Sequence, residues 1–64
     1  MLAIKQVRER LGMTQEQLAN MLGVTQGAVS QWEMGATRPA FDSLIKLAKA
    51  LGVTVDELIN GKEE

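Results

Sequence analysis

The side chains best suited to recognise a ligand lie in a helix that the sequence predicts from Gln26 to Met34. At about 100° per residue, one face of this helix carries only uncharged residues: Gln26, Gly27, Ser30, Gln31 and Met34. The opposite face is apolar and consists of Ala28, Val29 and Trp32. A glutamine amide presents a donor and an acceptor together, which matches N6 and N7 of adenine in the major groove of DNA. The alternative is an ordinary solvent-facing side, although such sides more often carry lysine and glutamate.

A four-residue pattern, Leu-Gly-x-Thr, marks the boundaries of the helices that must position this face. Its three copies begin at Leu11, Leu22 and Leu51. Glycine can adopt the left-handed conformation that closes a helix, and the threonine two positions later can accept a hydrogen bond from a free N–H of the next helix. The first two copies begin 11 residues apart, which leaves room for a helix of only about two turns. A short helix, a tight turn and a second helix form the arrangement that inserts a helix into a DNA groove.

Apolar spacing and cap residues predict five helices, at about residues 2–10, 15–22, 26–34, 41–51 and 55–60. The side chains expected to face inward include Ile4, Val7, Leu11, Leu18, Ala19, Leu22, Phe41, Leu44, Leu47, Ala48, Leu51 and Leu58. No segment alternates with the period of two that marks a strand. We therefore expect an all-α protein, a compact five-helix bundle in one domain over residues 1–61, followed by a short acidic tail at 62–64.

Composition excludes several classes of function. The chain has no cysteine and no histidine, which rules out disulfides and the common zinc sites, and no cofactor is expected. Without histidine, cysteine, tyrosine or a glycine-rich phosphate loop, only scattered carboxylates and lysines remain, so we do not expect an enzyme. No apolar run approaches the roughly 18 residues that span a membrane, and we expect a soluble, cytoplasmic protein.

Charge is distributed unevenly along the chain. The net charge is −1, but residues 1–55 carry six bases and four acids, or +2, and the last nine residues carry one base and four acids, or −3. A negative total argues against a nucleic-acid partner. Because the acids concentrate at the C-terminus, a DNA-binding face elsewhere remains compatible with the composition.

Residues 15–32 combine several residue types at fixed offsets: Leu18, Ala19, Gly23, Val24, Val29 and Trp32. In these residues, and in Trp32-Glu33-x-Gly35 and Leu47-Ala48-x-Ala50-Leu51-Gly52-Val53, the chain resembles the lambda repressor-like, or Cro/cI-type, helix-turn-helix family. The similarity covers nearly the whole chain. Physical reasons agree with it, since a larger residue at Ala19 would separate two crossing helices and a side chain at Gly23 would strain a left-handed turn.

The resemblance implies sequence-specific binding of double-stranded DNA by a transcriptional regulator, with repression as the expected role and the helix from Gln26 to Met34 in the major groove. It implies that Gln26, Ser30 and Gln31 read bases. Gly27 departs from the family, because many relatives have a polar side chain there, and we expect it to permit close backbone approach instead. The residues implied to approach phosphates are Thr14, Gln15 and Arg38, although Arg38 could simply be a solvated loop residue.

The resemblance also implies a structural ion pair between Arg8 and Glu33, which would contribute under about 1 kcal/mol if exposed. Because one short helix reads few bases, we expect a homodimer on a palindromic operator. Val55, Ile59 and the C-terminal segment are its expected interface. A protein-interaction module that keeps the fold without binding DNA is the alternative, favoured by the weak positive charge and by Gly27.

Overall fold

The computed structural model describes residues 3–60, which form helices joined by short turns and one longer loop. The helices are α1 (Ile4–Arg10), α2 (Gln15–Leu22), α3 (Gln26–Met34), α4 (Phe41–Leu51) and α5 (Val55–Asn60). Over this range there is no strand, as predicted. The predicted end of the domain at residue 61 and the acidic tail at 62–64 lie outside the described residues.

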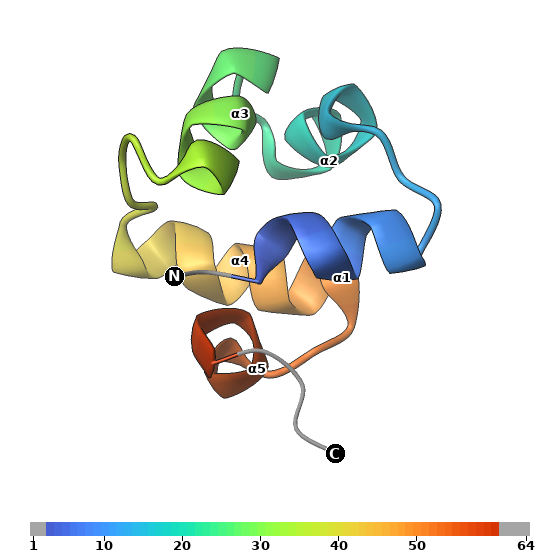
Figure 1. The fold of residues 1–64 in the computed structure, drawn as a ribbon, viewed down its shortest axis with the longest axis vertical. Coiled ribbons are helices and arrows are strands. Elements are labelled where there is room, and N and C mark those ends of the chain that lie inside the picture. Colours follow the sequence, from blue (N-terminus) through green and yellow to red (C-terminus); the bar gives the residue numbers. More distant parts are fainter. Residues whose placement is uncertain (1–2, 61–64) are drawn as a thin grey trace.

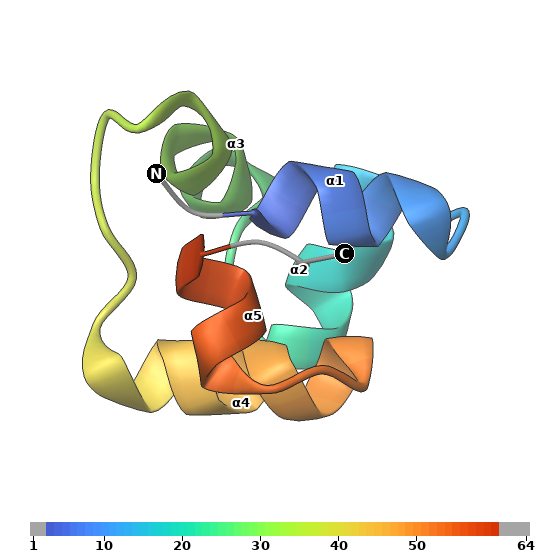
Figure 2. The same ribbon diagram turned by 60° about the horizontal axis from the view of Figure 1, so that its bottom comes forward.

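The helices are arranged so that α2 and α3 lie together at one end of the molecule and α5 lies at the other, with α1 and α4 between them (Figure 1). Helix α2 packs against both α3 and α4, and α1 packs against α3. Figure 2 shows α5 lying against α4. The start of α1 is tied to α5, because the N–H of Ala3 donates to the carbonyl oxygen of Leu58 at 2.7 Å. The helices α1, α4 and α5 thus form a support, held together at its ends, against which α2 and α3 pack.

The turn between α2 and α3 has the predicted cap residues at both of its ends. Gly23 closes α2 in the left-handed conformation, with φ of 74°. Two residues later, the hydroxyl of Thr25 accepts from the N–H of Ala28 at 3.1 Å and caps α3. Because glycine has no Cβ, it adopts this conformation without the penalty that other residues incur. The turn is therefore only three residues long, which determines how α3 leaves α2.

Reciprocal capping boxes open α2 and α5. At α2, the N–H of Gln17 donates to the hydroxyl of Thr14 at 3.0 Å, and the Gln17 side-chain oxygen accepts from the N–H of Thr14 at 2.9 Å. At α5, Thr54 and Glu57 make the same two bonds, both at 3.0 Å. Each box satisfies two backbone donors that a helix start leaves free.

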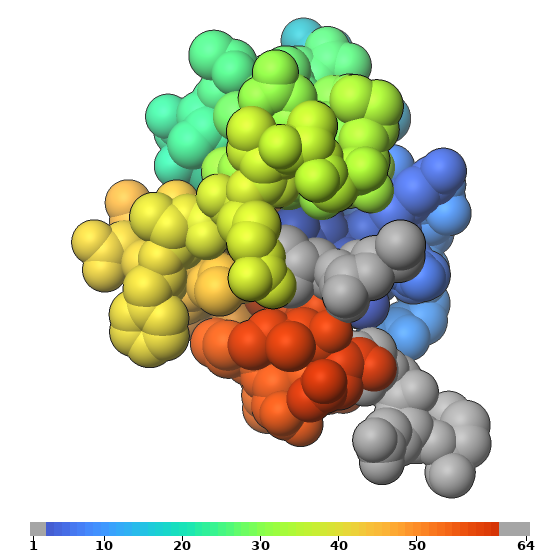
Figure 3. All heavy atoms as spheres, turned by 60° about the vertical axis from the view of Figure 1, so that its left-hand side comes forward, coloured from blue at the N-terminus to red at the C-terminus, as the bar shows by residue number. Residues whose placement is uncertain are grey.

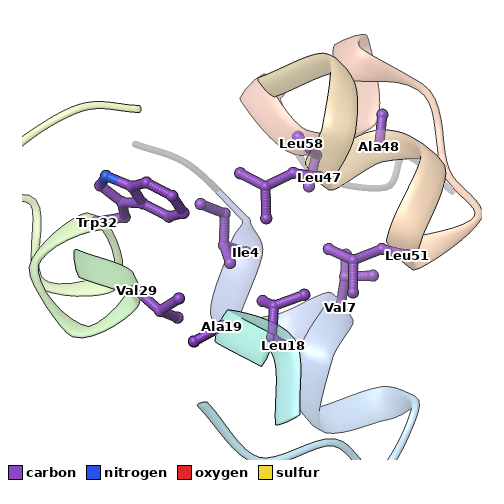
Figure 4. Close-up of a cluster of buried hydrophobic side chains, with 10 residues drawn as sticks. All are labelled: Ile4, Val7, Leu18, Ala19, Val29, Trp32, Leu47, Ala48, Leu51 and Leu58. Carbon is purple, nitrogen blue, oxygen red and sulfur yellow. The ribbon is translucent and has the colours of Figure 1, made fainter. Parts of the chain in front are cut away.

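All five helices contribute to one hydrophobic core (Figure 4). Its buried members are Ile4, Val7, Leu18, Ala19, Val29, Trp32, Leu47, Ala48, Leu51 and Leu58. Ala19 is 2% exposed where α2 meets α3, in agreement with the expectation that a small residue lets these helices approach. Val29 and Trp32 anchor α3 to the core, which determines the side of α3 that faces outward.

Two of the residues that we expected to face inward are exposed. Leu11 is 50% and Phe41 is 69% exposed. Leu11 is the C-cap residue of α1, and Phe41 is the first residue of α4, beside the loop that joins it to α3. In each case the apolar pattern extends to a residue at the end of the helix that no other helix covers.

Candidate nucleic-acid interface

The uncharged face of α3 lies on the outside of the bundle. Gln26, Gly27 and Gln31 are exposed and Ser30 is half-buried. On the opposite side of the same helix, Val29 is fully buried. The residues that we predicted to read bases therefore share one accessible face, on a helix whose rotation is determined by its buried side.

Gly27 has no steric role in this fold. Its φ is not in the left-handed region, and a Cβ at this position would meet only the Thr25 hydroxyl oxygen, at 3.8 Å. A glycine inside a helix costs about 0.5–1 kcal/mol relative to alanine. The helix would tolerate a side chain here, so the absence of one leaves open space on the exposed face beside Gln26.

Two of the predicted phosphate-binding residues lie at the start of α2. Thr14 is exposed and its hydroxyl is engaged in the helix cap. Gln15 is half-buried, and its side-chain oxygen accepts a hydrogen bond from the amide nitrogen of Gln26 at 3.3 Å. The structure therefore brings a predicted phosphate contact and a predicted base contact into direct hydrogen-bond contact with each other.

Arg38, the third predicted phosphate-binding residue, lies apart from that pair. It is exposed in the loop between α3 and α4, and lines a surface hollow with Pro39, Leu44 and Ile59. Figure 3 shows this side of the molecule, with the loop running between α3 and α5. Arg38 would reach a ligand from the far end of α3, beyond Met34.

The expected ion pair between Arg8 and Glu33 is present, and it is buried. The Nε of Arg8 donates to Glu33 Oε2 at 2.6 Å and its Nη2 donates to Oε1 at 3.0 Å. The two side chains are only 9% and 3% exposed. The remaining guanidinium nitrogen, Nη1, donates to the carbonyl oxygen of Met13 at 2.7 Å. The pair thus joins α1 to α3 and also holds the segment that leads into α2.

Both members of this pair are charged at neutral pH. Burial raises the pKa of Glu33, but hydrogen bonds from Arg8 and Gln15, with the positive charges of Arg8 and Lys5, outweigh it and leave the pKa below its ordinary value. The hydrogen bond to Glu33 raises the pKa of Arg8 above its ordinary value despite the opposing effect of burial. The carboxylate of Glu33 is therefore an ionised acceptor at neutral pH, near the start of α2.

One contact of this site escaped the sequence analysis. The side-chain nitrogen of Gln15 donates to Glu33 Oε1 at 2.9 Å, so Gln15 links the buried ion pair to Gln26. The sequence offers one indication of this contact, namely the positions of the three residues in their helices. Gln15 and Gln26 each begin a helix of the motif, and Glu33 lies seven residues, or about two turns, after Gln26 on the same helix.

Residues 3–60 lack both a metal-binding cluster and a membrane-spanning helix. These residues contain no group of three or more acidic, cysteine or histidine side chains placed to hold a metal ion. None of their helices is long and apolar enough to cross a membrane.

Comparison with related sequences gives matches over most of the chain. The model of a helix-turn-helix family matches residues 4–58. The HTH-type transcriptional activator BcrR of Enterococcus faecalis is 43% identical over 60 residues, which cover 94% of this chain and 29% of that protein. Repressor protein C2 of Salmonella phage P22 is 40% identical over 58 residues, which cover 91% of this chain and 27% of that protein. The chain thus spans less than a third of the length of either relative.

Solved structures match the fold equally well. The crystal structure of the P22 c2 repressor protein in complex with a synthetic operator has a TM-score of 0.85 and 39% identity, covering 92% of this chain and 89% of that one. The N-terminal DNA binding domain of SinR from Bacillus subtilis has a TM-score of 0.82 and 32% identity, covering 95% and 90%. Together with the outward face of α3 and the three-residue turn before it, these matches show that the chain belongs to the helix-turn-helix family, in its lambda repressor-like form.

Proposed function

We propose that the chain binds double-stranded DNA in a sequence-specific way and regulates transcription, with α3 in the major groove and α2 across the sugar-phosphate backbone. The observation that carries this proposal is the exposed, uncharged face of α3, whose orientation is determined by the buried Val29 and Trp32. The similarity to a repressor solved on its operator supports it. Repression is the simplest outcome, because a protein bound at a promoter excludes other proteins from that DNA. We place this activity in the cytoplasm, the compartment that holds the DNA of a bacterial cell.

In this proposal the contacts divide into two kinds. Gln26, Ser30 and Gln31 read base edges, with Gln26 as the candidate for a bidentate contact with adenine, and Gly27 lets the backbone of α3 approach the bases. Thr14, Gln15 and Arg38 lie against phosphates. The net charge of −1 predicts that these phosphate contacts are few and that affinity depends strongly on correct base contacts.

We further propose a homodimer that binds a palindromic operator with half-sites about 34 Å apart. Ile59 is 40% exposed on α5, where it lines the same surface hollow as Arg38, and Val55 is half-buried on the same helix. These residues are the proposed interface; the C-terminal segment that we also expected to take part lies outside the described residues. Sedimentation with and without operator DNA tests the dimer, and a single copy of the chain per operator at saturation would contradict it.

Selection of binding sites from random duplexes, followed by a salt titration on the selected duplex, tests DNA binding. We expect selection of a defined half-site and its inverted repeat. The logarithm of the binding constant should fall linearly with the logarithm of the salt concentration. The alternative, a protein-interaction module, predicts that no sequence is enriched and that binding to any duplex is weak. The matched control is a variant that replaces an exposed glutamine of α1, Gln6→Ala, which should select the same half-site.

A further inference from the structure

A continuous chain of hydrogen bonds runs from the interior of the molecule to the exposed face of α3. Glu33 accepts from Arg8 at 2.6 and 3.0 Å and from the side-chain nitrogen of Gln15 at 2.9 Å. The side-chain oxygen of Gln15 accepts from the side-chain nitrogen of Gln26 at 3.3 Å. The first residues of this chain are almost fully buried and the last is exposed. The chain therefore connects a rigid, charged pair to the side chain that is proposed to contact a base.

The direction of every bond in this chain is determined by its buried end. An ionised carboxylate can only accept and a guanidinium can only donate, so the Gln15 amide must point its nitrogen toward Glu33. The oxygen of Gln15 then faces Gln26, and only the amide nitrogen of Gln26 can bond to it. A glutamine amide has two opposite orientations of similar shape. Here the charge of Glu33 selects one orientation for each of the two glutamines.

This selection decides what Gln26 offers to a ligand. Its oxygen and the second N–H of its amide remain free, whereas the first N–H is held by Gln15. A free acceptor and a free donor on one amide are the groups that pair with N6 and N7 of adenine. Holding one amide hydrogen on Gln15 also removes part of the rotational freedom that Gln26 would otherwise lose on binding.

We propose that Glu33, acting through Gln15, orients the amide of Gln26 for base discrimination, so that Glu33 and Gln15 are positioning residues for DNA reading. This inference rests on the proposed function, because it assumes that Gln26 contacts a base. Its distinctive consequence is that a buried side chain without access to DNA controls the preference for one base pair.

Two variants interrupt the chain of hydrogen bonds from Glu33 to Gln26 at different places. Gln15→Met removes both amide hydrogen bonds while it keeps a side chain of similar length and leaves the bonds between Arg8 and Glu33 intact. The double variant Arg8→Met with Glu33→Leu removes the charged end and leaves no unpaired buried charge, since apolar replacement of a whole buried pair is often tolerated. The matched control is Gln6→Met, at an exposed glutamine on α1. If the double variant does not fold, as judged by circular dichroism, Gln15→Met carries the test alone.

The readout is the preference among four duplexes that differ only at the base pair whose selection is lost in Gln26→Ala. For the unmodified chain we expect the preferred base pair to bind about tenfold more tightly than the others. Gln15→Met and the double variant should each reduce that ratio to about threefold or less, while preferences at the other base pairs stay unchanged. Loss of the proposed phosphate contact of Gln15 would weaken all four duplexes by the same factor and leave the ratio unchanged, so only the ratio reports on the orientation of Gln26. Gln6→Met should change neither.

A second measurement needs no DNA. In the free protein, the side-chain NH₂ group of Gln26 should give a lower NMR order parameter in Gln15→Met and in the double variant than in the unmodified chain. The inference is overturned if both variants keep the original base preference, because the hydrogen bonds from Glu33 to Gln26 would then have no effect on base recognition. It is also overturned if Gln26→Ala itself alters no preference, but that result identifies the proposed base contact as the step that failed.

Discussion

Arg8 and Glu33, which are 25 residues apart, are joined by two hydrogen bonds in a site where their side chains are 9% and 3% exposed. A pair this deeply buried does not behave like a surface ion pair. Its two charges have lost most of their water, and each depends on the other for compensation. The pair therefore specifies how α1 and α3 fit together, and its net contribution to stability is a separate question that substitution can answer.

The first prediction is that loss of one partner destabilises the protein far more than loss of both. Glu33→Ala should lower the free energy of unfolding by about 3–5 kcal/mol, because the guanidinium of Arg8 would be left buried without its partner. The double variant Arg8→Met with Glu33→Leu should lie within about 1–2 kcal/mol of the unmodified chain. Urea denaturation followed by circular dichroism measures both. Glu9→Ala, at an exposed acid on the same helix as Arg8, is the control and should change stability by less than about 0.5 kcal/mol.

The second prediction concerns the pH dependence of stability. Because the pKa of Glu33 is lower in the folded protein than in the unfolded chain, folding favours its ionised form. The resulting stabilisation is complete above the unfolded-state pKa of about 4.3 and is lost as pH falls through the lower, folded-state value. Urea unfolding between about pH 2 and 7 should show this loss. The Arg8→Met, Glu33→Leu variant should lack that part of the decline, and an identical decline in both proteins would contradict the assignment to Glu33.

The third prediction compares two glycines that differ in backbone conformation. Gly23→Ala should destabilise by about 1–2 kcal/mol, because φ is 74° there, although a Cβ would have no neighbour within 4 Å. Gly27→Ala should stabilise by up to about 1 kcal/mol, because Gly27 is helical and a Cβ has room. The same substitution thus has opposite signs at the two positions. Thermal unfolding measures both, and equal shifts would show that the turn is not where we place it.

Gly27→Ala also tests the proposed close approach to DNA. A more stable α3 with weaker binding to the selected duplex would mean that the methyl group clashes with the DNA. Binding that is unchanged would remove Gly27 from the interface and leave its occurrence in α3 without a structural or functional reason.

The helix boundaries were predictable because they depend on short-range chemistry. Threonine at the start of a helix and glycine at its end act on backbone groups within four residues. Helices α2 and α3 have both residues and match the predicted bounds, and α4 ends at a glycine as predicted. The exposure of Leu11 and Phe41 was not predictable in the same way. Apolar spacing identifies the side of a helix that can be buried, but the length over which a partner covers that side depends on tertiary packing.

The candidate site was predictable in its members but not in its connections. The uncharged face of α3 follows from helical periodicity, and the pairing of Arg8 with Glu33 followed from the family resemblance. The depth at which the pair is buried did not follow from it, because exposure depends on how the helices pack around the pair. The bond from Gln15 to Glu33 joins two helices and depends on a separation of a few ångströms, which residue spacing does not define.

The fourth prediction distinguishes base contacts from phosphate contacts. Gln26→Ala should relax the preference at one base pair and cost about 1–3 kcal/mol in binding to the selected duplex. The control Gln6→Ala, at an exposed glutamine of α1, should leave the preference unchanged. Competition between duplexes that differ at single positions provides the measurement. If every preference survives, Gln26 does not read a base.

The fifth prediction concerns Arg38, which is exposed in the loop after α3. Arg38→Gln should weaken binding to all duplexes by a similar factor, without a change in preference, because a phosphate contact carries no sequence information. It should also reduce the slope of log affinity against log salt by about 1. Lys49→Gln, at an exposed base on α4, is the control, since it removes the same net charge away from the proposed face. Equal effects of the two substitutions would mean that only net charge matters, and Arg38 would then be an ordinary solvated residue of the loop.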